Sequence, residues 1–150
     1  MKNIFLLATA TAISVSCSSL KPGDSVLKQD IPYSEARNYF VKNDLDASIN
    51  NTKFESKKDF DKVFGMATTM GENGKPTAID FSNEFVVAQI EDPSTQKVEL
   101  KPVSIIKNAN ILEIKYRKIV GENQSYTSQS AMLLVIDKKY NGDVSFVEVQ

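Results

Sequence analysis

From residue 77 to the end of the chain, apolar residues tend to recur at every second position, which is the period of a half-buried β-strand. The clearest run is 112–117, in which Leu, Ile and Tyr alternate with Glu, Lys and Arg. Further strands are predicted over Thr77–Phe81, Phe85–Glu91 and Lys97–Ile106, the first two joined as in a hairpin. Pro102 predicts an edge or a β-bulge, because proline cannot donate a hydrogen bond to a ladder.

Two later segments extend the β pattern. Residues 131–136 (AMLLVI) are apolar at every position, as expected of a strand that is covered on both faces. Asn141 and Gly142 form the dipeptide most typical of a tight hairpin, and residues 144–149 follow as the partner strand. We therefore expect a run of about six hairpin-linked strands in this half of the chain.

The first half contains one predicted strand and one predicted helix. Residues 36–42 (ARNYFVK) carry a short apolar block that favours a strand. Ser56 stands three residues before Asp59, the spacing of a helix N-terminal cap, and Phe60, Val63 and Phe64 then fall on one helical face. We expect a helix over 57–64 that packs its phenylalanines on a sheet and ends at a left-handed Gly65. An aromatic patch for a partner is the alternative.

These elements predict a mostly β fold, a small antiparallel OB-like β-barrel with one short α-helix closing one end. Closure into a barrel removes exposed strand edges, which favours it over a sandwich. The predicted domain spans 34–150, and about 134 residues without the leader suffice for one hydrophobic core. We expect a monomer.

The first sixteen residues read as a lipoprotein signal peptide, with Lys2 followed by an apolar run that is too short to span a bilayer. Cys17, the single cysteine of the chain, stands where a bacterial lipobox places the acylated residue. Residues 17–33 then predict a flexible tether from the membrane. The alternative is a plain signal peptide that leaves Cys17 as a free thiol. In either case we expect export, and with acylation a lipid anchor in the outer membrane, facing the periplasm or the surface.

Composition excludes several functional classes. The chain has no histidine, so catalysis by Ser-His-Asp or Cys-His groups and imidazole metal sites are excluded. The sequence pI is about 5.5, and no basic cluster indicates nucleic-acid binding. A glycosidase with paired carboxylates stays formally possible. We expect no enzyme activity, no catalytic residues, no metal and no cofactor.

A function must then depend on loops carried by a rigid scaffold. Three polar segments stand out, and strands that alternate in direction would bring them to one end, where they would share one face: residues 70–76 (MGENGKP), 91–96 (EDPSTQ) and 121–129 (GENQSYTSQ). Tyr126 has the most weight, because exposed tyrosines often dominate protein interfaces. The alternative is that these segments are ordinary polar turns. The candidate binding residues are Glu72, Asn73, Asp92, Pro93, Ser94, Thr95, Glu122, Gln124 and Tyr126.

The lipoprotein-like leader and the segments 39–44 (YFVKND), 59–89 (DFDKVFGMATTMGENGKPTAIDFSNEFVVAQ) and 121–129 are similar to a family of small Bacteroidetes lipoproteins. Within it the chain resembles the potempins over roughly residues 35–150. The resemblance implies an OB-type barrel of the cell envelope that inhibits secreted peptidases by inserting loops into the protease cleft.

The resemblance leaves the target open between metallo, serine and cysteine peptidases. For a metallopeptidase, the carboxylates that could face the zinc are Glu72, Glu91, Asp92 and Glu122. The rival hypotheses are a non-catalytic envelope lipoprotein that binds another protein or a glycan, and a structural accessory without a soluble ligand.

Overall fold

The computed structural model describes residues 28–43, 52–71 and 73–150. In chain order the elements are β1 Gln29–Asp30, β2 Ser34–Glu35, β3 Tyr39–Val41, β4 Thr52–Phe54, α1 Lys57–Val63, β5 Phe64–Met66, β6 Glu84–Ile90, β7 Ser94–Asn108, β8 Ile111–Ser128, β9 Ala131–Asp137, a 3-10 turn Lys138–Tyr140, and β10 Asp143–Glu148. The predicted signal peptide, Cys17 and Glu72 lie outside the described residues. No helix among those described is long and apolar enough to cross a membrane.

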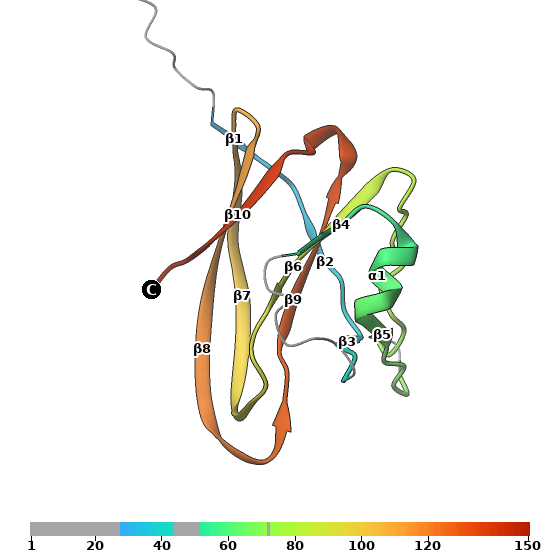
Figure 1. The fold of residues 1–150 in the computed structure, drawn as a ribbon, viewed down its shortest axis with the longest axis vertical. Helices are drawn as coiled ribbons and strands as arrows, with labels where there is room; N and C mark the ends of the chain where they lie inside the picture. Colours follow the sequence, from blue (N-terminus) through green and yellow to red (C-terminus); the bar gives the residue numbers. More distant parts are fainter. Residues whose placement is uncertain (1–27, 44–51, 72) are drawn as a thin grey trace, which may run out of the picture.

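The strands form three sheets, ordered β1-β7-β8-β10, β2-β9-β6-β4 and β3-β5. Figure 1 shows how the first two arise: the antiparallel pair β6 and β9 turns back at its lower end into the long pair β7 and β8, which lies across it. The prediction of a mostly β fold with one short helix is confirmed. The predicted closed barrel is wrong, because the strands of the described residues form three open sheets.

Sheet β2-β9-β6-β4 is the middle layer, since its two central strands are buried on both faces. Phe85 and Val87 of β6 point to the first core, which is shared with sheet β1-β7-β8-β10. Val86 and Ala88 point to the second core, which is shared with α1 and β5. This explains why residues 131–136 are apolar throughout, as the sequence predicted.

Helix α1 confirms the predicted start and most of the predicted length. The Ser56 hydroxyl accepts a hydrogen bond from the Asp59 N–H at 3.2 Å, and Phe60 and Val63 are buried. The predicted left-handed stop at Gly65 is wrong: the chain passes through an extended Phe64 straight into β5. Gly65 is instead covered by the ring of Phe40, which would have to move aside for a larger side chain.

Two predicted boundaries differ from the structure. Gln29 and Asp30 pair with β7, and Ile31 is buried in the first core. The tether predicted over 17–33 is therefore too long, because residues 29–31 belong to the folded domain. The strand predicted over Thr77–Phe81 is absent; this segment lies outside the described ladders. The Pro102 irregularity is confirmed, because the β7–β8 register shifts between Pro102 and Ser104.

The predicted hairpin at Asn141-Gly142 is also wrong. The 3-10 turn over Lys138–Tyr140 carries the chain from the middle sheet to the outer one, where β10 pairs with β8 in parallel. Asn110, at the turn between β7 and β8, accepts from the Asp143 N–H at 2.7 Å and donates its amide to the Asp143 carboxylate at 3.0 Å. These contacts align the start of β10 with the start of β8.

Candidate functional site

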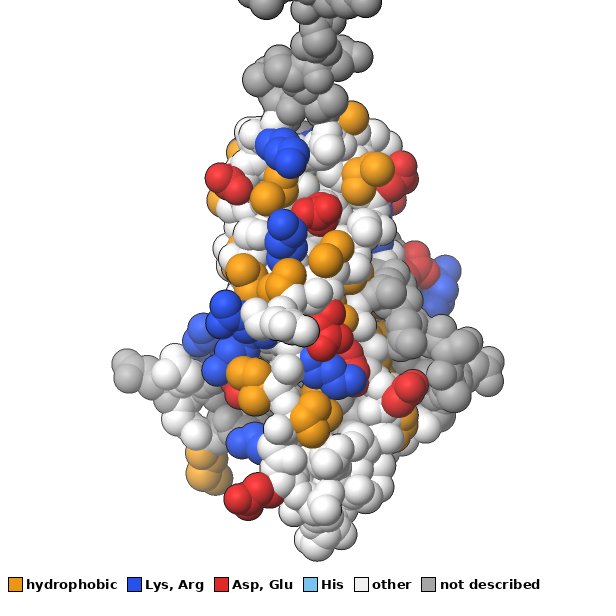
Figure 2. Space-filling view, turned by 90° about the vertical axis from the view of Figure 1, so that its left-hand side faces the viewer, with side chains coloured by type: hydrophobic (Ala, Val, Ile, Leu, Met, Phe, Trp, Pro, Cys, Tyr) orange, Lys and Arg blue, Asp and Glu red, His pale blue; other side chains and the backbone are white. Residues whose placement is uncertain are grey.

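The lower halves of β7 and β8 pair only with each other among the described residues. Strand β1 pairs with β7 only at Ile106 and Lys107, and β10 pairs with β8 only as far as Tyr116. We call residues 94–105 and 117–128 the ribbon. Residues 117–123 are exposed at every position. In Figure 2 this side of the molecule carries interspersed basic, acidic and hydrophobic side chains, and its lower end is mostly uncharged.

The ribbon ends in a wide bulge. The pairs Gln96–Asn123 and Ser94–Ser128 leave Thr95 alone on β7 opposite residues 124–127 of β8. The Ser128 hydroxyl donates to the Gln124 side-chain oxygen at 3.4 Å across the bulge. A bulge redirects side chains away from the regular alternation of a strand, and Tyr126 within it is 60% exposed. We call residues 92–96 and 122–128 the bulged end.

Most of the predicted binding residues meet at this bulged end. They are Asp92, Pro93, Ser94, Thr95, Glu122, Gln124 and Tyr126. The predicted loop 121–129 is mostly strand, since β8 continues to Ser128, and the loop-like part is confined to the bulge.

Asn73 lies apart from this group. Its carbonyl oxygen accepts from the Asn38 amide at 2.6 Å, which ties the segment to the chain just before β3. In Figure 1 the segment that follows β5 is also at the lower end, but on the helix side of the middle sheet. The three polar segments therefore share an end without sharing one surface.

Two contacts fix the ribbon beside the bulged end to the lower ends of β6 and β9, and a third joins these two ends to each other. The Glu91 N–H donates to the Ser130 carbonyl oxygen at 2.9 Å, and the Ser130 hydroxyl donates to the Val98 carbonyl oxygen at 2.6 Å. The Lys118 ammonium donates to the Glu91 carboxylate, whose side chain is only 13% exposed. Glu91, one of the predicted zinc-facing carboxylates, is thus already paired.

The ion pair with Glu91 changes the titration of Lys118. The hydrogen bond to Glu91 raises the pKa of Lys118 above 10.5, against the opposing effect of partial burial. The native state therefore holds this proton more tightly than the unfolded chain does. The resulting stabilisation is complete below pH 10.5 and is lost as the pH rises through the native pKa.

Lys118→Met is expected to lower the free energy of unfolding near neutral pH by up to about 1 kcal/mol. The difference from the wild type should shrink above pH 10.5, since the wild type loses its ion pair there. Urea denaturation at a series of pH values measures this. Lys101→Met is the control, because Lys101 and its partner Glu99 are both about half exposed. An equal pH dependence for both variants would contradict the prediction.

Sequence reasoning missed two features. Ile119 and Val120 belong to the ribbon and are 43% and 52% exposed, although the prediction ended the strand at Arg117. The β-branched pair Ile119-Val120, close behind the clear alternation, could have indicated the extension. An apolar pocket beside α1 was also missed, because the segment 77–81 was interpreted as a strand rather than as a covering loop.

No group of three or more Cys, Asp and Glu residues in the described part of the chain could hold a metal ion. Searches against known protein families, curated proteins and solved structures found no match.

Proposed function

We propose that this chain is an inhibitor of secreted peptidases that binds the protease cleft through the bulged end. The observation that carries the proposal is the bulge itself: the exposed Tyr126 lies in a segment of β8 that is paired with β7 at both of its ends. Exposed tyrosines supply large contact area at low entropic cost, and they are common at the centre of protein interfaces. The lipid anchor expected at Cys17 would keep the inhibitor at the outer membrane.

The free edges of the ribbon support the same proposal. Over residues 117–123, the edge of β8 that faces away from β7 pairs with no described strand, so its backbone N–H and C=O groups are open to a partner. Addition of an extended segment through such groups is a common mode of peptide recognition. A peptidase accepts its substrate as an extended chain, so the ribbon edge can imitate a substrate.

The ladder also explains why such a segment would resist turnover. Ile119, Val120 and Asn123 are paired with β7 on one side of the bulge, and Ser128 is paired with Ser94 on the other side. If a peptide bond within the bulge were cut, both new ends would stay attached to β7 and close to the active site. Religation or slow release would then be favoured over loss of the product.

Asp92 and Glu122 are the carboxylates best suited to face a catalytic zinc ion in a metallopeptidase target. Both side chains are exposed at the bulged end, whereas Glu91 is occupied by Lys118. A serine or cysteine peptidase would depend on Tyr126 and the ribbon edge alone. The two target classes are distinguished by Asp92→Asn and Glu122→Gln, which should weaken only metallopeptidase inhibition.

The proposal is tested by incubating the exported chain with metallo, serine and cysteine peptidases and measuring residual activity. We expect stoichiometric inhibition of at least one enzyme. Tyr126→Ala should raise the inhibition constant about 10-fold to 100-fold, the effect of losing an interface residue worth roughly 1.4 to 3 kcal/mol. Its melting temperature should stay unchanged, because the side chain is mostly exposed.

Ile111→Ala is the matched control, since Ile111 is 49% exposed at the opposite end of the same strand pair. It should leave inhibition unchanged. Failure to inhibit any class at micromolar concentration would reject the proposal. Saturable binding of another envelope protein or a glycan would then favour the alternative, a non-catalytic binding lipoprotein.

A further inference from the structure

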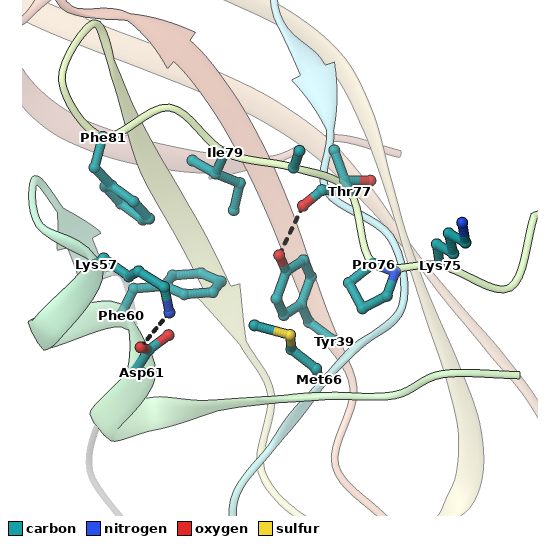
Figure 3. A pocket seen from close by; sticks show the side chains of 11 residues that line it. Tyr39, Lys57, Phe60, Asp61, Met66, Lys75, Pro76, Thr77, Ile79 and Phe81 are labelled. Carbon is teal, nitrogen blue, oxygen red and sulfur yellow. Dashed lines mark hydrogen bonds and ion pairs between the residues drawn. The ribbon is translucent and has the colours of Figure 1, made fainter.

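A pocket of about 430 Å³ lies between α1, β3, β5 and the segment 75–81. Figure 3 shows the side chains of Tyr39, Phe60 and Ile79 directed toward a common space, with Met66 and Phe81 beside them. Its volume falls within the range of small-molecule sites, and such sites are lined mainly by apolar and aromatic side chains with a few polar groups. The pocket belongs to a different layer from the ribbon, so any ligand here is independent of the bulged end.

The covering segment is fixed at both of its ends, which keeps the pocket open. The Tyr39 hydroxyl donates to the Thr77 carbonyl oxygen at 2.7 Å, and the Thr77 N–H donates to the Arg37 carbonyl oxygen at 3.1 Å. The Lys138 ammonium donates to the Phe81 carbonyl oxygen at 2.5 Å. Between these contacts the segment lies outside the described ladders, and it packs on the helix at Phe81, whose ring centroid lies 5.6 Å from that of Phe60.

The charged residues that line the pocket favour an anion at its mouth. Lys57 is paired with Asp61, so these two charges compensate each other. Lys75 adds a positive charge and is exposed, and Figure 3 draws its side chain beyond Pro76 at the rim. Inside, the Tyr39 hydroxyl already donates to Thr77, so the floor presents hydrocarbon rather than free donors.

We propose that this pocket binds a small monoanionic amphiphile of the fatty-acid type, with its hydrocarbon body against Ile79 and Met66 and its carboxylate near Lys75. Burial of the hydrocarbon supplies the affinity, at roughly 25 cal/mol per Å² of apolar surface. The net positive charge at the rim selects a carboxylate over an ammonium group. The pocket adds a ligand-binding function that the peptidase proposal does not require.

Binding is tested with decanoate, below its micelle-forming concentration, on the full chain labelled with ¹³C at the methionine methyl groups. Met66 lines the pocket, whereas Met70 is fully exposed and lies outside the lining residues. We expect a saturable shift of the Met66 signal and none of the Met70 signal. Decanol and decylammonium, which share the hydrocarbon body, should bind more weakly than decanoate.

Two variants test separately whether binding depends on the charge at the rim and on the free volume of the pocket. Lys75→Glu should weaken decanoate binding about tenfold at low salt and leave decanol unchanged, whereas Lys101→Glu, on the far sheet, should change neither. Ala78→Trp should block the mouth and abolish binding, since Ala78 is an exposed lining residue that can be enlarged without unfolding the chain. Equal shifts of Met66 and Met70, equal affinity for decylammonium, or undiminished binding by Ala78→Trp would each overturn the proposal.

Discussion

Phe60→Ala is expected to lower the free energy of unfolding by about 3–5 kcal/mol, the usual cost of truncating a buried phenylalanine. Phe60 is 1% exposed, and its ring centroid lies 4.9 Å from that of Phe64 and 5.1 Å from that of Tyr39. Its removal leaves a cavity beneath α1 that its aromatic neighbours cannot fill without leaving their own contacts. Urea denaturation followed by circular dichroism measures the change.

Phe60→Leu keeps the variant testable if the alanine protein does not fold, because it preserves most of the apolar volume and should cost less than the alanine change. Tyr126→Ala is the control for aromatic truncation, and its effect should stay within about 0.5 kcal/mol, since that side chain is mostly exposed. Equal losses from Phe60→Ala and Tyr126→Ala would contradict the assignment of Phe60 to the core.

Features that depend on neighbouring residues in the sequence were predicted well. The helix cap at Ser56 depends only on a hydroxyl that accepts from the N–H three residues later, so it can be predicted from the local sequence. The burial of residues 131–136 on both faces follows from their continuous apolar character. The irregularity beside Pro102 follows from its missing N–H.

Features that depend on distant partners were not predictable in this way. The parallel pairing of β10 is set by Asn110, which lies more than thirty residues earlier in the chain and binds Asp143 at the sheet edge. An Asn-Gly dipeptide indicates a local hairpin, and no local signal opposes it. The predicted closure into a barrel is wrong for the same reason, because the two four-stranded sheets pack on each other as layers and need no closed ladder.

The candidate site was predictable in part. Successive antiparallel strands return to the same end, which correctly brought Asp92–Thr95 beside Glu122–Tyr126. The bulge that exposes Tyr126 arises from the register in which β7 pairs with β8. Local sequence patterns do not reveal that register. Asn73 was misplaced because its position depends on the side chain of Asn38, whose backbone has a φ of 62°.

Gly142→Ala is expected to lower the free energy of unfolding by about 1–3 kcal/mol, the range for forcing an extra carbon into a packed position. A Cβ at this position would lie well inside contact distance of the Asn110 carbonyl oxygen and 3.1 Å from its carbonyl carbon. The same carbonyl oxygen accepts from the Asp143 N–H at 2.7 Å. The backbone at Asn110 must therefore move, and this weakens the first pairs between β10 and β8.

Gly65→Ala is the matched control, because a Cβ there would also be crowded, 2.8 and 2.9 Å from the two Cε atoms of Phe40. The obstacle is here the far end of a half-exposed side chain, which can rotate away. Alanine also relieves the entropic cost of a glycine within a strand, about 0.5–1 kcal/mol, so the net change should lie near zero. Urea denaturation of both variants measures the difference, and hydrogen exchange at residues 143–148 should rise only in Gly142→Ala. Equal stability of the two variants would contradict the prediction, because it would mean that the Asn110 backbone can move aside without weakening the attachment of β10.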